Sequence, residues 1–159
     1  MLKHPFKAIY NNDSKILILG SFPSVKSREQ KFFYGHPQNR FWKVMAAVLN
    51  EKIPETIKEK KTMMLAHGIA LWDVIASCEI TGSSDSSIEN AVPNDLSPIF
   101  YKGKILKVFC NGSKSFELYE KYTFPITKIK AEKLPSTSPA NASWNLEKLI
   151  KEWKSKLGI

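Results

Sequence analysis

The stretch Lys15-Ile-Leu-Ile-Leu-Gly20 is a short apolar run that ends at a glycine. A run that is apolar at successive positions, rather than at every second one, is typical of a central strand buried on both faces of a parallel sheet. Residues 69–74 and 105–110 have the same character and predict two more strands, and residues 126–134 predict a fourth. The sequence therefore indicates a four-stranded, mainly parallel sheet.

Helical segments alternate with these predicted strands. Apolar residues recur at helical spacing within 39–49, and Pro54 opens a stretch rich in Lys and Glu that ends at Gly68, so we expect two helices between the first two strands. Residues 112–122 and 141–157 predict the helices that follow the third and fourth strands. Because strands that alternate with helices form a sheet covered on both faces, we expect a three-layer α/β/α fold.

One segment between the predicted elements differs in composition. Residues 81–97 are rich in Ser, Asp, Asn and Pro, which favour turns. They predict a long loop with a short helix after Asn94.

The chain has 159 residues, of which 43% are hydrophobic, so residues 1–159 can form a single domain with one sizeable core. Lys and Arg number 24 against 15 Asp and Glu, a net charge of +9 that is typical of proteins that meet phosphate or another anionic surface. No apolar run approaches the roughly 20 residues needed to span a membrane, and residues 1–10 show no signal-peptide core. We therefore expect a cytoplasmic protein, associated with the nucleoid if the source is prokaryotic.

Metal and nucleotide chemistry receive no support from the motifs. Cys78 and Cys110 are the only cysteines, and neither has a second Cys or a His at metal-ligand spacing, so we expect buried, reduced thiols and no metal. The chain contains neither GxxxxGK[ST] nor GxGxxG, which disfavours nucleotide hydrolysis and dinucleotide binding. We expect no cofactor.

In an open parallel sheet, ligands bind at the carboxyl ends of the strands. Three segments of small and polar residues follow predicted strands: Gly20-Ser-Phe-Pro-Ser24, Asn111-Gly-Ser113 and Pro135-Ser-Thr-Ser-Pro-Ala-Asn141. The first lets a backbone approach a ligand closely, although by itself it also fits an ordinary turn. The third can press against a duplex and bond its phosphates, although Asn141 or Ser143 can also cap the helix that follows.

The segment Phe32-Phe-Tyr-Gly-His-Pro-Gln-Asn-Arg-Phe-Trp42 gathers aromatic, amide and cationic side chains before a predicted helix. Aromatic rings offer stacking faces to a nucleobase, and amides can pair with its edge. Phe41 and Trp42 fit the helix core. Asn39 fits an N-cap and an active-site residue about equally well.

Taken in order, these segments resemble the uracil-DNA glycosylase superfamily, and within it the branch of hypoxanthine-DNA (deoxyinosine) glycosylases. Gly35-His-Pro-Gln-Asn-Arg-Phe-Trp42 looks like the HPxNxFW stretch of mismatch-specific uracil and thymine glycosylases. Leu134-Pro-Ser-Thr-Ser-Pro-Ala-Asn141 resembles the loop that enters the minor groove and helps to expel the base. Gly20-Ser-Phe-Pro-Ser24 is similar to the motif that holds the flipped base and the attacking water.

The first motif departs from the family pattern. Mismatch-specific enzymes carry an Asn there that positions water, and classical uracil enzymes carry an Asp, whereas this chain has Phe22. The resemblance therefore implies that Asn39 is the catalytic residue that orients the water. An amide is not a general base, so the activity should lack some or all of the roughly 10²–10⁴-fold that a well-placed base contributes.

The resemblance also implies the remaining site residues. Base-binding residues are expected at Gly20, Ser21, Phe22, Tyr34 and Asn111. DNA-binding residues are expected at Ser24, Arg40, Pro135, Ser136, Thr137, Ser138, Pro139, Ala140 and Asn141. Lys26, Arg28, Lys31 and Lys114 could add phosphate contacts, although each also fits a solvated surface charge.

The implied activity is that of a monofunctional DNA-deoxyinosine glycosylase, a monomer whose partner is DNA that contains a deaminated base. Two alternatives stay open: a uracil glycosylase that acts on mismatches or single strands, and a non-catalytic nucleic-acid-binding domain. A small-molecule α/β hydrolase ranks last, because the chain lacks a GxSxG elbow.

Overall fold

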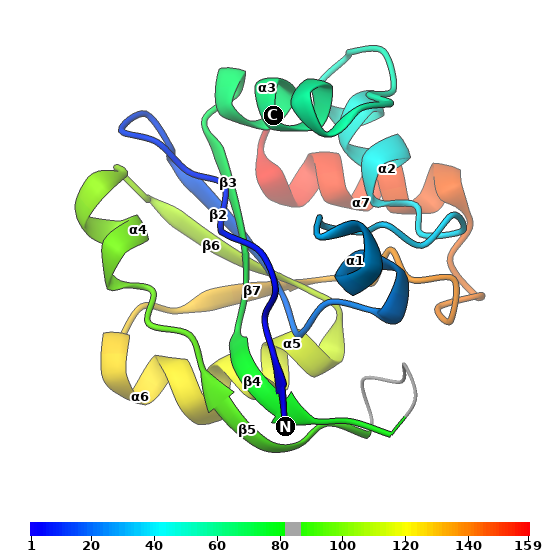
Figure 1. Ribbon diagram of the computed structural model, residues 1–159. Helices are drawn as coiled ribbons and strands as arrows, with labels where there is room; N and C mark the ends of the chain where they lie inside the picture. Colours follow the sequence, from blue (N-terminus) through cyan, green and yellow to red (C-terminus); the bar gives the residue numbers. More distant parts are fainter. Residues whose placement is uncertain (82–86) are drawn as a thin grey trace.

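The computed structural model describes residues 1–81 and 87–159 of the chain. Its central sheet has the strand order β3 (Ile69–Asp73), β2 (Ile16–Gly20), β6 (Lys107–Asn111) and β7 (Ala131–Leu134), and every neighbouring pair is parallel (Figure 1). The expected four-stranded parallel sheet is therefore confirmed. Since the strands are parallel and in register, their carboxyl ends meet at one edge.

The two faces of the sheet are both covered by helices. Ile16 and Ile18 of β2 face a hydrophobic cluster with α2 (Phe41–Val48), α3 (Ile57–Ala66) and α7 (Leu146–Leu157). Leu17 and Leu19 face a second cluster, formed with the helices on the other side of the sheet. Those helices are α4 (Ser97–Lys102), α5 (Ser113–Leu118) and the π-helical turn η2 (Tyr119–Thr123). This double burial explains why the strand is apolar at successive positions, and it confirms the three-layer α/β/α fold.

A second, antiparallel sheet was not predicted. It contains β1 (Leu2–Lys3), β4 (Ile75–Glu79) and β5 (Glu89–Pro93), and a single residue separates β4 from β3. The prediction of a continuous loop over 81–97 is therefore wrong for β5, because pairing with β4 overrides the turn-forming composition. Residues 82–86 of that predicted loop lie outside the described residues. The helix expected after Asn94 is present as α4.

Three helix predictions need correction. α1 (Val25–Gln30) precedes α2, so three helices rather than two lie between β2 and β3 in the described chain. α6 (Phe124–Thr127) occupies the start of the predicted fourth strand, and Lys128, with φ of 59°, ends this helix before β7 begins. α7 begins at Leu146 with Asn145 as its N-cap, so neither Asn141 nor Ser143 caps it.

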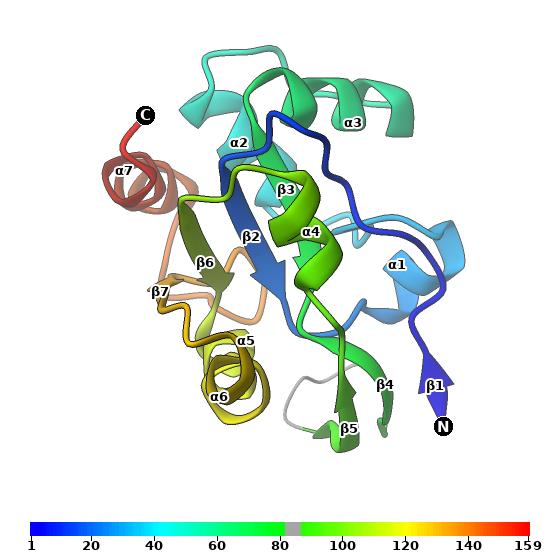
Figure 2. The same cartoon turned by 90° about the vertical axis from the view of Figure 1, so that its left-hand side faces the viewer.

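The N-terminal segment lies along the β3 edge of the central sheet. Ile9 exchanges backbone hydrogen bonds with Leu71 of β3, and the His4 amide donates to the Ala76 carbonyl of β4 at 2.8 Å. Figure 2 shows this segment in dark blue, running past α1 to β1, which lies next to β4. Residues far apart in the sequence are thereby brought to the carboxyl end of β3.

Candidate active site

A cavity of about 1090 Å³ lies at the carboxyl edge of the central sheet. The last residue of each of the four strands lines it: Gly20, Asp73, Asn111 and Leu134. The cavity therefore lies where parallel sheets bind ligands.

The residues expected at the site converge on this cavity. Those that line it are Asn39, Gly20, Ser21, Phe22, Tyr34, Asn111, Ser24 and all of 135–141. Arg40 is the exception, and its guanidinium donates to backbone carbonyls of residues 137–144.

Gly20 makes room for two side chains. A Cβ on this glycine would lie 2.5 Å from Oδ1 of Asp73 and 3.3 Å from the Tyr34 hydroxyl oxygen. The first distance is shorter than any normal carbon–oxygen contact, so the glycine lets the carboxylate lie against the β2 backbone. The sequence predicted a close approach at Gly20, and the group that approaches is a neighbouring side chain.

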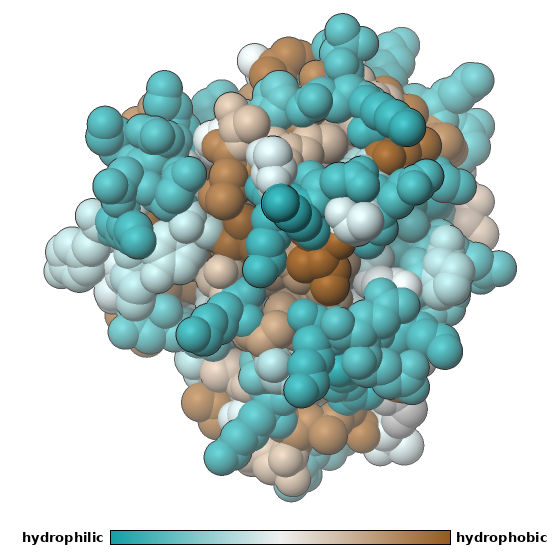
Figure 3. Space-filling model, turned by 45° about the horizontal axis from the view of Figure 1, so that its top comes forward, coloured by the Kyte–Doolittle hydropathy of each residue, from teal (hydrophilic) through white to brown (hydrophobic). Residues whose placement is uncertain are grey.

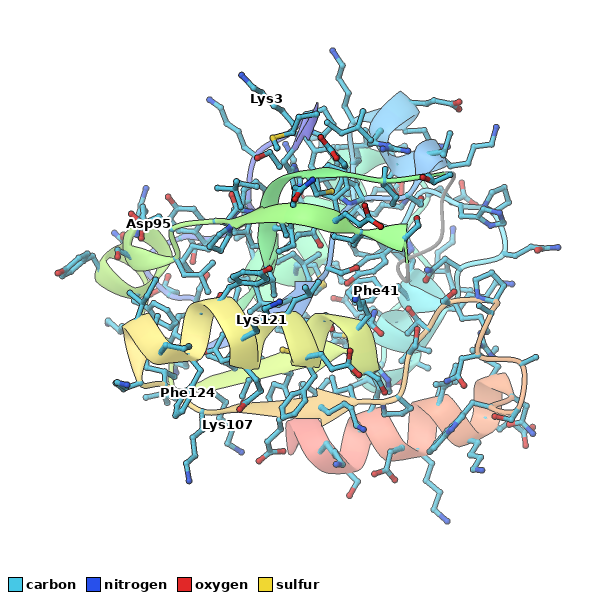
Figure 4. The ribbon with its side chains drawn as sticks, turned by 90° about the horizontal axis from the view of Figure 1, so that it is seen from below. Lys3, Phe41, Asp95, Lys107, Lys121 and Phe124 are labelled. Atoms are coloured by element: carbon cyan, nitrogen blue, oxygen red, sulfur yellow. The ribbon has the colours of Figure 1, made fainter. Side chains whose placement is uncertain are left out.

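Aromatic side chains form one wall of the cavity. Tyr34 has a φ of 53°, and its ring stacks on Phe41 with the centroids 4.0 Å apart and the planes 18° apart. Phe41 is fully buried, and Figure 4 labels it near the middle of the view, whereas Lys3 and Asp95 lie toward the edge. Phe22 is buried in the second hydrophobic cluster and also lines the cavity. The stack with Phe41 fixes the Tyr34 ring in the wall.

A hydrogen-bonded chain of side chains forms another part of the cavity wall. Nδ2 of Asn111 donates to the Thr137 hydroxyl at 3.0 Å, and that hydroxyl donates to Oδ1 of Asn39 at 2.9 Å. The Thr137 amide in turn donates to Oδ1 of Asn111 at 3.1 Å. Thr137 is fully buried, so the network holds together the loops after β2, β6 and β7.

The orientation of the Asn39 amide follows from this network. Its Oδ1 also accepts from the backbone amide of Phe41 at 2.9 Å, in the manner of a cap on α2. Two donors on one atom identify that atom as the oxygen. Asn39 therefore caps α2 and lines the cavity at the same time, and its Nδ2 donor is the end of the amide that remains for a ligand.

Arg40 braces the loop at 135–141. Its Nη2 donates to the carbonyls of Ser138 at 2.8 Å and Asn141 at 3.1 Å, and its Nη1 donates to the carbonyl of Trp144. Its Nε donates to the Thr137 carbonyl at 3.4 Å. Four backbone carbonyls thus accept from one guanidinium, so Arg40 braces the loop, and its expected role in DNA binding stays a prediction.

The loop that Arg40 braces is exposed at its apex. The Asn141 side chain donates to the Ser136 carbonyl at 3.0 Å, and Nε1 of Trp153 donates to the Pro135 carbonyl at 2.9 Å. Pro139 and Ala140 are exposed. The loop is therefore tied at its base and presents small residues to the surroundings.

Two polar residues at the site were missed from the sequence. Asp73 lines the cavity and is 4% exposed, and its Oδ2 lies 2.7 Å from Nε2 of His4. Asp73 could have been found, because a carboxylate at the carboxyl end of a buried strand is unusual. His4 lies 69 residues away in the sequence, and no local pattern connects it to Asp73.

The rim of the cavity is mainly basic. The lysines that line it are Lys26, Lys114, Lys133 and Lys156. Of the other cations considered from the sequence, Arg28 lies over the Phe22 ring, 5.8 Å from its centroid. Figure 3 shows hydrophilic side chains over most of another face of the molecule, with hydrophobic areas between them.

Two properties of the described residues bear on alternatives. Within 1–81 and 87–159, no helix is long and apolar enough to cross a membrane. Burial, and next the charge of Glu120, raises the pKa of the Cys110 thiol to about 12, so this side chain is not a reactive thiolate at neutral pH.

The known proteins to which this chain is similar are described as DNA glycosylases. A protein from Methanosarcina acetivorans named hypoxanthine DNA glycosylase is 34% identical over 98% of this chain and 98% of its own length. A protein of the same name from Methanosarcina barkeri is 32% identical over 74% of this chain and 75% of its own. A Methanosarcina acetivorans structure solved by solution NMR, described as a candidate uracil DNA glycosylase, superposes with a TM-score of 0.79 at 34% identity, covering 98% of this chain and 96% of that one.

The family model of the uracil DNA glycosylase superfamily matches residues 8–157, which contain all three of the quoted motifs. The motifs meet at one cavity, at the sheet edge where this architecture binds ligands. This chain belongs to the uracil DNA glycosylase superfamily.

Proposed function

We propose that this protein is a monofunctional DNA glycosylase that flips a deaminated base, hypoxanthine above others, out of DNA and hydrolyses its N-glycosidic bond. The observation that carries the proposal is the Asn39–Thr137–Asn111 network in the wall of a cavity at the sheet edge. The cavity, about 1090 Å³, is slightly larger than the roughly 300–1,000 Å³ of small-ligand sites, which leaves room for a flipped nucleotide. The names of the two Methanosarcina relatives support hypoxanthine as the base.

Asn39 is proposed to position the attacking water. Because its oxygen already accepts from Phe41 and Thr137, the Nδ2 hydrogen donates to the water and leaves a lone pair of the water oxygen for C1′ of the sugar. The C1′–N9 bond of the nucleotide breaks as the C1′–O bond forms, and the electron pair departs with the base. The water loses a proton to solvent or to the departing base. Catalysis by positioning alone fits a modest rate.

The base is proposed to stack on Tyr34, whose ring is held by Phe41. Gly20, Ser21 and Phe22 form the floor of the base pocket. Asn111 uses its oxygen and one amide hydrogen on Thr137, so we assign it to holding the network beside the base.

DNA is proposed to lie against the exposed apex of the 135–141 loop and the lysines of the rim. The small residues of the apex allow close approach to the duplex, and the lysines neutralise phosphates. Arg40 acts through the loop that it braces rather than on phosphate. The protein is proposed to act as a monomer in the cytoplasm or nucleoid, where its substrate is.

A single-turnover excision assay tests the proposal. Matched labelled duplexes carry inosine, uracil or no lesion, and alkali cleaves the resulting abasic sites. Cleavage of the inosine strand is expected. Cleavage of the uracil strand alone would make uracil the substrate, as the description of the superposed structure suggests. Binding without any cleavage would favour a non-catalytic domain.

A further inference from the structure

The buried pair of His4 and Asp73 has no part in the mechanism above. Asp73 is a deeply buried polar residue of the cavity wall, with 4% of its surface exposed. Its Oδ2 lies 2.7 Å from Nε2 of His4, and Nδ1 of His4 accepts from the backbone amide of Phe6 at 3.5 Å. An imidazole that accepts at Nδ1 donates its proton from Nε2, so His4 is a donor to the carboxylate.

The carboxylate of Asp73 is held in one orientation. The His4 ring is packed 4.3 Å from the Trp72 ring and 4.5 Å from the Phe6 ring, measured between centroids. The other oxygen, Oδ1, lies over Gly20, close to the place where a Cβ would be. With Oδ2 held by His4, Oδ1 is the acceptor that faces the β2 end of the cavity.

Asp73 and the Asn39 network line the cavity from opposite sides of β2. The Asn39 network is attached to β6 and the loop after β7, whereas Asp73 ends β3, at the opposite side of β2 in the sheet. The glycosidic bond must lie by the water at Asn39. The ring edge remote from the sugar then points toward β3.

A carboxylate only accepts hydrogen bonds, so it distinguishes bases by the atom that they present. Hypoxanthine carries N1–H and uracil carries N3–H, whereas the parent bases adenine and cytosine carry a lone pair at those positions. Guanine and thymine also carry an N–H there, so a carboxylate separates each deaminated base from its own parent only.

We infer that Asp73 accepts the ring N–H of the flipped deaminated base and is a specificity-determining residue of this enzyme, and that His4 is its positioning residue. The inference rests on the proposed function. Sites that hydrogen-bond a substrate N–H reject an analogue that lacks it by about 10⁴–10⁵-fold at most. His4 and the N-terminal segment thus belong to the recognition site rather than to the scaffold alone.

The test compares wild type and Asp73→Asn in single-turnover excision of inosine and of adenine, each opposite cytosine so that both are mispaired. The amide can turn its NH₂ toward the base, so excision of inosine is expected to fall about 100-fold and the preference for inosine over adenine at least about tenfold. Binding to a duplex with a tetrahydrofuran abasic analogue should stay within about twofold, because no base is present to be read.

Variants of His4 separate positioning from packing. His4→Ala should lower the preference for inosine, and His4→Gln, whose amide can donate from nearly the place of Nε2, should restore much of it. Glu51→Gln is the matched control, because Glu51 forms a similar 2.7 Å contact with His67 away from the cavity. Its selectivity should equal that of wild type.

The outcomes are distinguishable. If wild type excises inosine and Asp73→Asn keeps its rate and selectivity, the role of Asp73 is wrong and the glycosylase function stands. If Asp73→Asn loses inosine excision and abasic-duplex binding equally, Asp73 is structural and the inference fails. If wild type excises neither inosine nor uracil, the proposed function fails, and the role of Asp73 fails with it.

Discussion

Two polar sides of the cavity are held in different ways. The loop side consists of Asn39, Arg40, Asn111 and Thr137, which share many hydrogen bonds with one another and with loop carbonyls. The strand side consists of the His4–Asp73 pair, joined by one 2.7 Å contact in a shell of aromatic rings. In the proposed mechanism the loop side positions groups around the sugar, and the strand side accepts a hydrogen bond from the edge of the base.

This difference predicts how each side fails. A network that shares its hydrogen bonds loses part of its geometry when one member is removed, whereas a buried pair leaves one charged or polar group without any partner. The loop side should therefore respond mainly in activity and DNA affinity. The strand side should respond in stability as well as in base selection.

The largest effect is expected from Asn39→Ala. Removal of a single positioned donor in an active site lowers the rate by about 10²–10³-fold, and we expect that loss in the single-turnover excision of inosine. Duplex affinity, measured by fluorescence anisotropy, should change less than about threefold, because the loop and the lysines remain. Excision at the wild-type rate would show that Asn39 does not position the water, and the loop side would then have no catalytic residue.

The next effect, on stability, is expected from His4→Ala. The substitution leaves the buried Asp73 carboxylate without its partner, and breaking a buried pair from one side costs about 3–5 kcal/mol. Urea unfolding should show this loss as a lower midpoint at unchanged slope. The double variant His4→Ala, Asp73→Asn should recover part of the lost stability. If His4→Ala destabilises the protein no more than His67→Ala does at the exposed His67–Glu51 pair, the His4–Asp73 pair does not stabilise the strand side in the way described.

The two sides also differ in how far the sequence revealed them. The apolar run at 15–20 predicted a strand buried on both faces, and this followed because burial leaves its mark on successive residues. The segments that contain Asn39 and residues 135–141 could be recognised in the sequence because their polar residues are neighbours along the chain. Asp73 and His4 were not, since a contact across 69 residues depends on where the N-terminal segment lies against β3.

Two features that the sequence did not reveal have the same origin. β5 has a turn-forming composition and becomes a strand only because β4 offers an edge to pair with. Arg40 was expected to bind DNA, which stays a prediction, and the partners of its guanidinium in the structure are carbonyls about a hundred residues further along the chain. Propensity and motif describe neighbours in the sequence, and tertiary pairing decided both cases.

A smaller effect is expected from Arg40→Lys, which tests how the loop side depends on Arg40. Lysine keeps the charge but cannot reach several carbonyls with one planar fork, so DNA affinity should fall about tenfold, as it should in Arg40→Gln. Lys114→Ala is the contrast, because loss of a phosphate contact lowers the salt dependence of log K by about 0.9. Arg40→Lys should leave that slope unchanged, and a slope reduced as in Lys114→Ala would make Arg40 a phosphate ligand after all.

The smallest effect is expected from Thr137→Val, which removes the hydroxyl between Asn111 and Asn39 and keeps the shape of the side chain. Oδ1 of Asn39 still accepts from Phe41, so the amide stays oriented and loses one of its two restraints. One neutral hydrogen bond contributes about 1 kcal/mol, which corresponds to an excision rate about fivefold lower. Thr137→Ser should keep the wild-type rate, because its hydroxyl can make both bonds. A Thr137→Val loss as large as that of Asn39→Ala would show that the loop side depends on one contact, as the strand side does.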